Sequence, residues 1–143
     1  MPMMASAPVF GITVEESLNI AEIASLPAVA FRCIQYLEAK KADQEEGIYR
    51  LSGSSAVIKS LKDRFNNGVC ISFFTSSHPA DHPIAEGDVD LLASDEFWDP
   101  HAIAGLLKTY FRDLPSSILT RDLHLRFLAV IGRYSQPSLW ISS

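Results

Sequence analysis

Apolar residues recur every three or four positions in four segments of this sequence, and that spacing restricts the chain to a fold built from helices. The segments cover residues 26–41, 54–67, 99–114 and 120–132, and glycine or proline separates them. A shorter helix is predicted after Thr13, which can form a capping box with Glu16. We find no convincing strand pattern and no internal repeat. The predicted fold class is all-α.

The helix ends carry residues that favour starting or stopping a helix. Ser54 or Ser55 is the expected N-cap of the third helix, and Asp99-Pro100 opens the fourth. Each of the four longer helices has one apolar face that we expect to be buried. These faces consist of Leu26, Ala30, Cys33, Ile34, Leu37; Val57, Ile58, Leu61, Phe65; Ile103, Leu106, Leu107, Tyr110, Phe111; and Leu123, Phe127, Val130, Ile131.

Composition narrows the class of protein. The chain has 143 residues, of which 48% are hydrophobic and 20% charged, which predicts a folded domain with a sizeable core. The net charge of −5 argues against nucleic-acid binding. Cys33 and Cys70 do not suggest a disulfide framework. Residues 1–10 lack the features of a secretory signal, and no apolar run approaches the roughly 20 residues that span a bilayer. We therefore expect a cytoplasmic location and no direct membrane insertion.

A short segment bracketed by Gly47 and Gly53 lies between the second and third predicted helices. Glycine permits backbone angles that other residues avoid, so the loop can turn sharply at both ends. We expect its apolar side chains to hold the loop against the core while Arg50 points outward. Those apolar side chains are Ile48, Leu51 and, with a weaker case, Tyr49.

Arg50 is the residue of this loop with a functional interpretation. Its guanidinium is always charged and presents a planar fork of donors that suits a phosphate group. The competing interpretation is a surface ion pair with Glu45 or Glu46, which would be weak. An outward arginine without a carboxylate partner could serve the active site of another protein.

Other polar residues are weaker candidates. Ser52 and Ser54 favour capping over nucleophilic chemistry, since no His and Asp arrangement accompanies them. The segment 78–82 (HPADH) has ligand-like residues but is short, broken by proline and without a fourth ligand, so no metal site is predicted. Lys108 and Arg112 lie four apart on one helix face, where spacing alone favours simple solvation.

Taken together, these segments resemble the RhoGAP domain, the GTPase-activating module for Rho-family small GTPases. Phe10-Gly11-Ile12 is similar to the start of the family, and segment 33–38 (CIQYLE) after Leu26-Pro27 to its first long helix. Segment 46–53 (EGIYRLSG) resembles the arginine-finger loop, and segment 106–115 (LLKTYFRDLP) the second signature. The amino-acid sequence around Arg50 most resembles that of fungal polarity-type members of the family.

The resemblance implies a set of roles. Arg50 is the implied catalytic finger, which enters the active site of a GTP-bound Rho-family GTPase. Lys108 is implied to contact that GTPase, Arg112 to support the finger loop by hydrogen bonds, and Gly47 and Gly53 to shape the loop. The chain is then not an enzyme itself and needs no cofactor, because GTP and Mg²⁺ belong to the partner GTPase.

Two segments depart from the family pattern. The RhoGAP-like region is assigned to residues 10–131, with the C-terminal helices of the family missing. Within it, residues 68–85 form an irregular insert, which we hypothesise to be a retained intron, and residues 132–143 form a tail unlike the family. The alternatives to a GTPase activator are therefore a catalytically inactive GTPase-binding module and a truncated, non-functional isoform. Membrane recruitment would come from domains outside this chain.

Overall fold

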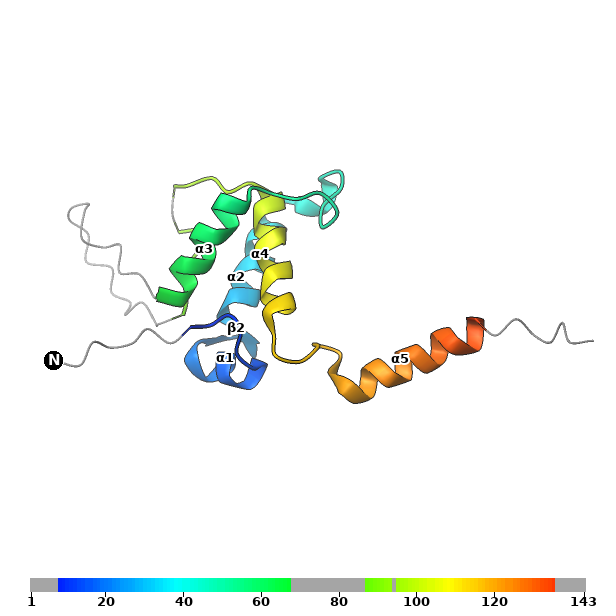
Figure 1. The fold of residues 1–143 in the computed structure, drawn as a ribbon. Coiled ribbons are helices and arrows are strands. Elements are labelled where there is room, and N and C mark those ends of the chain that lie inside the picture. Colours follow the sequence, from blue (N-terminus) through cyan, green and yellow to red (C-terminus); the bar gives the residue numbers. More distant parts are fainter. Residues whose placement is uncertain (1–7, 68–86, 94, 136–143) are drawn as a thin grey trace, which may run out of the picture.

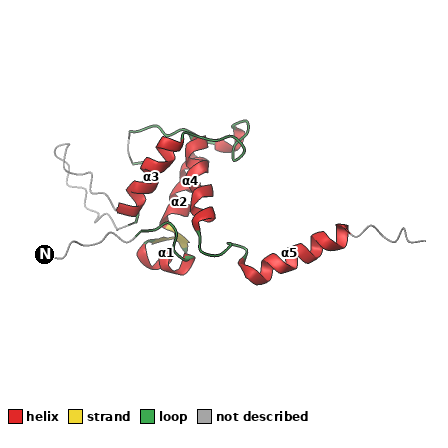
Figure 2. Cartoon of the chain, viewed as in Figure 1, coloured by secondary structure: helices red, strands yellow, loops and turns green. Residues whose placement is uncertain are grey.

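The computed structural model describes residues 8–67, 87–93 and 95–135. Its helices are α1 (Val14–Ile20), α2 (Ala28–Ala39), α3 (Ser55–Asn67), α4 (Pro100–Asp113) and α5 (Thr120–Ser135), with a short 3₁₀ helix η1 (Ala42–Gln44) (Figures 1 and 2). The helix-rich fold confirms the predicted class. The predictions for an insert at 68–85, for Cys70, for segment 78–82 and for the last eight positions of the tail fall outside the described residues.

One small sheet was not predicted. Strands β1 (Glu22–Ile23) and β2 (Leu26–Pro27) pair antiparallel, with Ile23 opposite Leu26. Ala24 and Ser25 connect them with φ of 52° and 63°, as a tight hairpin turn requires. A strand of two residues is too short to show alternation, so the expectation that the chain contains no strand was wrong at this point.

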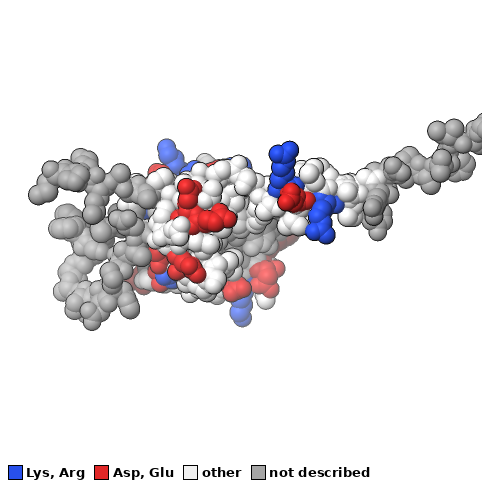
Figure 3. Space-filling model, turned by 90° about the horizontal axis from the view of Figure 1, so that it is seen from below, with Lys and Arg blue, Asp and Glu red and all other residues white. Residues whose placement is uncertain are grey.

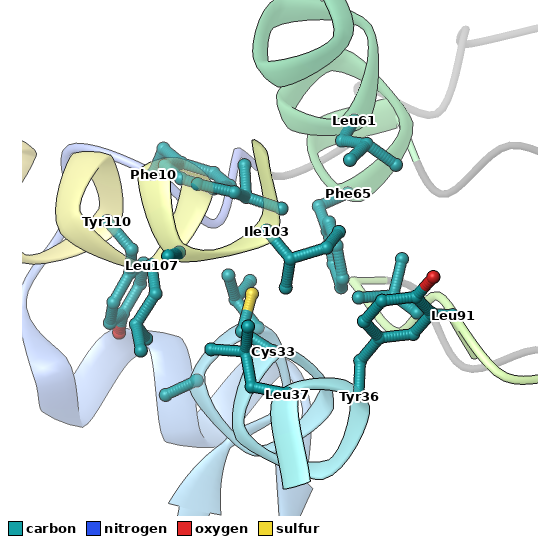
Figure 4. Close-up of a cluster of buried hydrophobic side chains, with 14 of the residues drawn as sticks. Phe10, Cys33, Tyr36, Leu37, Leu61, Phe65, Leu91, Ile103, Leu107 and Tyr110 are labelled. Carbon is teal, nitrogen blue, oxygen red and sulfur yellow. The ribbon is translucent and has the colours of Figure 1, made fainter. Parts of the chain in front are cut away.

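Three helices build the body of the domain. Helix α4 packs against both α2 and α3, and α1 with the hairpin closes one end (Figure 1). Their shared core includes Cys33 of α2, Leu61 and Phe65 of α3, and Ile103 of α4, each with no exposed surface (Figure 4). Phe10 reaches this core from the N-terminal segment and packs edge-on against Tyr110, with ring centroids 5.6 Å apart. The core of α4 and α3 is therefore the one that their periodicity predicted.

The predicted caps are confirmed. Thr13 accepts a hydrogen bond from the Glu16 backbone while the Glu16 carboxylate accepts one from Thr13 N, which completes the capping box. Asp99 caps α4 by accepting from His101 N at 3.1 Å. Ser54 Oγ accepts from Val57 N at 3.4 Å, so Ser54 rather than Ser55 caps α3. These side chains satisfy backbone donors that a helix leaves without partners in its first turn.

Polar contacts between distant segments fasten the chain around this core. Asn66 Oδ1 accepts from the backbone nitrogens of both Val9 and Phe10, at 2.9 and 3.2 Å. Arg32 of α2 forms two parallel hydrogen bonds of 2.8 Å with Asp88, and its third nitrogen lies 3.1 Å from Asp90. Both contacts join segments far apart in the sequence.

Helix α5 corrects a prediction about burial. It begins at Thr120 as expected but continues past Gly132 to Ser135, and it extends away from the body (Figure 1). The face that we expected to be inward is exposed, with 53% of Phe127 and 59% of Ile131 accessible. Periodicity predicts an apolar face and says nothing about what covers it.

Two further residues of α2's predicted face are not buried. Leu26 is 40% exposed because it belongs to the short hairpin, and Ile34 is 36% exposed at the margin of the helix contact. Ala30, Cys33 and Leu37 of the same face are buried as predicted.

Candidate functional site

The arginine loop lies beside the N-terminal part of α4, at the end of the bundle away from α1 (Figure 1). Gly47 turns the chain with φ of 75°, and its carbonyl accepts hydrogen bonds from Arg50 N at 2.9 Å and from Leu51 N at 2.8 Å. Tyr49 between them has φ of 65°, a left-handed conformation that costs a residue with a side chain about 1–2 kcal/mol. The loop is therefore a defined turn that presents Arg50 at its tip.

The side chain of Arg50 is exposed, as predicted. It lies over its own loop, because a terminal guanidinium nitrogen sits 3.1 Å from the position that a β-carbon on Gly47 would take. Within the described residues, no acidic side chain forms an ion pair with Arg50, so the pairing with Glu45 or Glu46 is not seen. Its charge is available to a phosphate partner.

Fewer apolar side chains hold the loop to the core than predicted. Ile48 packs against the core as expected, but Tyr49 is 50% and Leu51 45% exposed. Leu51 instead covers Gly47, where an added β-carbon would lie 2.8 Å from its Cγ. Because both side chains are about half exposed, the expectation that they anchor the loop in the core was wrong.

Gly53 shapes the loop through close approach, not through an unusual backbone angle. A β-carbon on Gly53 would lie 2.3 Å from Ala102 N and 2.4 Å from Ala102 Cα. Gly53 is not among the residues with positive φ, so only Gly47 meets the expectation of a special backbone angle. The C-terminal end of the loop is packed directly on the first turn of α4.

Lys108 links α4 to the loop. Its Nζ donates a hydrogen bond to the carbonyl oxygen of Tyr49 at 2.7 Å, across 59 sequence positions. Sequence spacing did not identify this contact, because the acceptor is a backbone carbonyl and leaves no mark on residue type. The structure therefore gives the loop-supporting contact to Lys108.

Arg112 lies one helical turn beyond Lys108 and does not make the expected contact. Its side chain is 74% exposed, and its Nε lies 3.7 Å from Asp113 Oδ1. Asp113 is already paired with Lys62 of α3 at 2.6 Å. In the described part of the chain, Arg112 donates no hydrogen bond to the finger loop, so the supporting role implied for it stays a prediction.

Other reactive groups lie away from this loop. Burial raises the pKa of the Cys33 thiol to about 12, which keeps it protonated and unreactive. Burial also raises the pKa of Tyr110. Among the described residues, no three acidic, histidine or cysteine side chains gather where they could hold a metal ion. Nor is any helix there long and apolar enough to cross a membrane.

Charge is distributed in small groups over the surface. Seen from below, acidic and basic side chains lie in small groups among uncharged atoms, and several groups contain both charges side by side (Figure 3). The finger loop and α4 together place Arg50, Lys108 and Arg112 as exposed cations from two elements. The site is therefore an exposed arginine, without an ion-pair partner among the described residues, on a turn that a lysine of α4 supports.

Comparison with known proteins gives the family. The RhoGAP domain model matches residues 27–138, so the chain belongs to the RhoGAP family. It is 45% identical over 122 residues to "Probable Rho-type GTPase-activating protein 2" of Schizosaccharomyces pombe, with 83% of this chain and 8% of that protein covered. It is 32% identical over 142 residues to "GTPase-activating protein BEM3" of Saccharomyces cerevisiae, with 96% of this chain and 12% of that protein covered. The chain thus spans only a small part of these relatives.

The fold is also similar to a solved structure. The crystal structure of human Rho GTPase-activating protein 15 matches with a TM-score of 0.61 and 24% identity. The match covers 90% of this chain and 51% of that one. The family resemblance read from the sequence is therefore confirmed, while the boundaries at 10–131 and 132–143 stay predictions.

Proposed function

We propose that this domain accelerates GTP hydrolysis by a Rho-family GTPase, with Arg50 as the catalytic arginine supplied in trans. The observation that carries the proposal is the exposed, unpaired guanidinium of Arg50 on a turn fixed by Gly47. Membership of the RhoGAP family and the names of the relatives support the same activity. The partner is the GTP-bound form, and signalling ends when the GTP is hydrolysed.

The mechanism follows from the charge that develops during phosphoryl transfer. Negative charge spreads over the transferring group, and the GTPase and its Mg²⁺ leave part of it uncompensated. A guanidinium inserted there can donate to two oxygens at once, which a lysine ammonium cannot do in a fixed plane. Such an arginine is worth about 10³–10⁵ in rate, or roughly 4–7 kcal/mol of activation free energy.

The remaining residues have supporting roles in this proposal. Gly47 and Gly53 give the loop its turn and its contact with α4, and the exposed Lys108 and Arg112 face the GTPase. GTP and Mg²⁺ are held by the partner, so the domain carries no cofactor and no hydrolase activity of its own. We place this activity in the cytoplasm, where Rho-family GTPases meet their regulators.

Single-turnover hydrolysis tests the proposal. A GTP-loaded Rho-family GTPase is mixed with excess 143-residue chain, and phosphate release is followed for the native chain, Arg50→Ala and Arg50→Lys. The native chain should accelerate hydrolysis, while both variants should lose most of the acceleration at an unchanged melting temperature. Arg126→Ala, an exposed arginine of α5, is the control and should keep full activity.

Two results would contradict the proposal. Equal acceleration by the native and Arg50→Ala chains would remove Arg50 from the mechanism. Binding of the GTPase without any acceleration would identify a non-catalytic binding module.

A further inference from the structure

Helix α5 lies apart from the rest of the domain. Every residue from 120 to 132 is exposed. Among the described residues, α5 shares no interface comparable with the one that joins α4 to α2 and α3 (Figure 1). A helix of 16 residues without such packing is only marginally stable in water. A surface that covers its apolar side chains would therefore stabilise it.

The large apolar side chains of α5 gather mainly on one face. Leu123, Phe127 and Ile131 follow one another at intervals of four positions, which places them in a row along the helix. Val130 lies beside this row, because it is three positions after Phe127. All four side chains are exposed. These four residues form an apolar face of α5 that is open to solvent over more than two turns.

The charge of α5 is opposite in sign to that of the rest of the chain. The helix contains three arginines and one aspartate, which is a formal charge of +2. The whole chain carries −5, so the residues outside α5 carry −7. Arg121 and Arg126 are exposed and lie about 120° and 100° around the helix from Phe127, on its two sides. Positive charge therefore flanks the apolar face.

This combination of properties favours one kind of partner. Helices that lie on membranes bury an apolar face among the headgroups and upper acyl chains, and keep basic residues beside it. Anionic headgroups attract each such residue. A second α5 is a poorer partner, because each helix carries +2 and the two would repel. No described helix is long and apolar enough to cross a membrane, so α5 would lie on the surface.

We propose that α5 binds the surface of anionic membranes, with Leu123, Phe127 and Ile131 toward the acyl chains. The helix extends away from the acidic body, so it can reach the lipid while the body stays in solution (Figure 1). Salt screens the repulsion between the body and the lipid beyond about 8 Å at physiological ionic strength. The proposal concerns a surface separate from the finger loop.

Vesicle binding by the full 143-residue chain tests the proposal. The chain is mixed with vesicles of equal parts phosphatidylcholine and phosphatidylserine, and the bound fraction is measured by co-sedimentation over a range of lipid concentrations. The native chain should bind these vesicles, and should bind pure phosphatidylcholine vesicles at least about 10-fold more weakly. Added salt should release it.

Variants of the two faces of α5 locate the contact. Phe127→Gln combined with Ile131→Gln removes apolar surface without changing the charge, and should weaken binding at least about 10-fold. Leu125→Gln is the matched control, because Leu125 is 56% exposed but lies about 200° around the helix from Phe127. This control should bind as the native chain does.

A charge variant tests the contribution of the arginines. Arg121→Gln combined with Arg126→Gln should weaken binding to the anionic vesicles by about 10- to 30-fold, since each basic residue near the surface contributes separately. Binding to phosphatidylcholine should change little. All of these variants should unfold in urea as the native chain does, because the substituted side chains lie outside the core.

Several results would overturn the proposal. One is a native chain that does not bind the anionic vesicles, and another is a loss in Leu125→Gln as large as that in Phe127→Gln with Ile131→Gln. A stable native dimer in sedimentation velocity that the latter substitutions dissociate would show that a second copy covers this face. A loss of stability in urea from the same substitutions would show that α5 packs on its own body. None of these measurements depends on catalysis by Arg50.

Discussion

The backbone of Gly53 lies directly against Ala102, so close that no side chain fits between the finger loop and α4. A β-carbon at position 53 would come within 2.3 Å of Ala102 N and 2.6 Å of the carbonyl carbon of His101. Because these atoms are backbone in the first turn of a core helix, they cannot move aside as a flexible side chain could. The contact fixes the loop at its C-terminal end, as the Lys108 bond fixes it near its tip.

Gly53→Ala should therefore destabilise the domain and displace the finger. Overpacking of this kind costs about 1–3 kcal/mol, and the loop must shift to make room for the methyl group. Urea unfolding should show the loss of stability, and single-turnover hydrolysis should show reduced acceleration. Gly132→Ala is the matched control, because nothing lies within 4 Å of a β-carbon there and alanine favours the helix. Equal effects of the two substitutions would contradict the packing argument.

The Arg32–Asp88 pair predicts a second difference in stability. Asp88 accepts two bonds of 2.8 Å from Arg32, and the two side chains are only 17% and 20% exposed. This contact fastens the segment containing the buried Leu91 to α2. Asp88→Asn should cost about 1–3 kcal/mol, since a partly buried charged hydrogen bond is lost.

A surface ion pair supplies the control for this prediction. Glu96 pairs with Arg64 at 2.9 Å but is 52% exposed. Glu96→Gln should cost less than about 1 kcal/mol, because solvent screens such pairs. Urea unfolding of both variants tests the difference. A loss of stability for Glu96→Gln as large as that for Asp88→Asn would show that the Arg32–Asp88 contact stabilises the fold no more than a surface ion pair does.

Local features of this fold could be predicted from the sequence, and long-range ones could not. Thr13 and Glu16 form the capping box of α1 and lie only three positions apart, so the residue pattern alone was sufficient to predict this cap. Phe65 and Leu61 were placed in the core by periodicity. In contrast, Asn66 binds Val9 N, and Lys108 binds the Tyr49 carbonyl. In each of these bonds one partner is a backbone atom, which every residue has, so residue types do not reveal the contact.

The finger loop shows the same division. The turn at Gly47, the exposed arginine and the place of the loop between two helices were predicted correctly, whereas the special backbone angle expected at Gly53 was not found. The direction of Tyr49 and Leu51 was not, because it depends on the left-handed backbone at Tyr49. Non-glycine residues adopt that conformation only under tertiary constraint, so propensity gives no sign of it.

The Cys33 thiol gives a prediction about reactivity and pH. Cys33 has no exposed surface, and burial raises its pKa to about 12. In a Cys70→Ser chain at pH 8, a thiol reagent such as DTNB should react only when urea unfolds the protein. Rapid reaction of the folded chain would show that Cys33 is accessible.

The same raised pKa has a consequence for stability. The unfolded chain loses the thiol proton at an ordinary pKa near 9.0, whereas the folded chain keeps it until about pH 12. Between these values the folded state binds more protons, so its stability should fall as the pH rises. Burial raises the pKa of Tyr110 in the same direction, so Cys33→Ala should reduce the slope without abolishing it. Urea midpoints at pH 8 and pH 10 would measure the effect, and an identical slope in both chains would contradict it.

Two phenylalanines in helices give the sharpest contrast in stability. Phe65 of α3 has no exposed surface, whereas Phe127 of α5 is 53% exposed. Phe65→Ala should cost about 3–5 kcal/mol, the range for removing a buried aromatic ring, and Phe127→Ala should leave the free energy of unfolding nearly unchanged. Phe127→Ala should also reduce self-association at high concentration, since α5 exposes several large apolar side chains together. Urea unfolding and sedimentation velocity of the two variants provide the test. A large loss of stability in Phe127→Ala would mean that α5 packs against the body in solution.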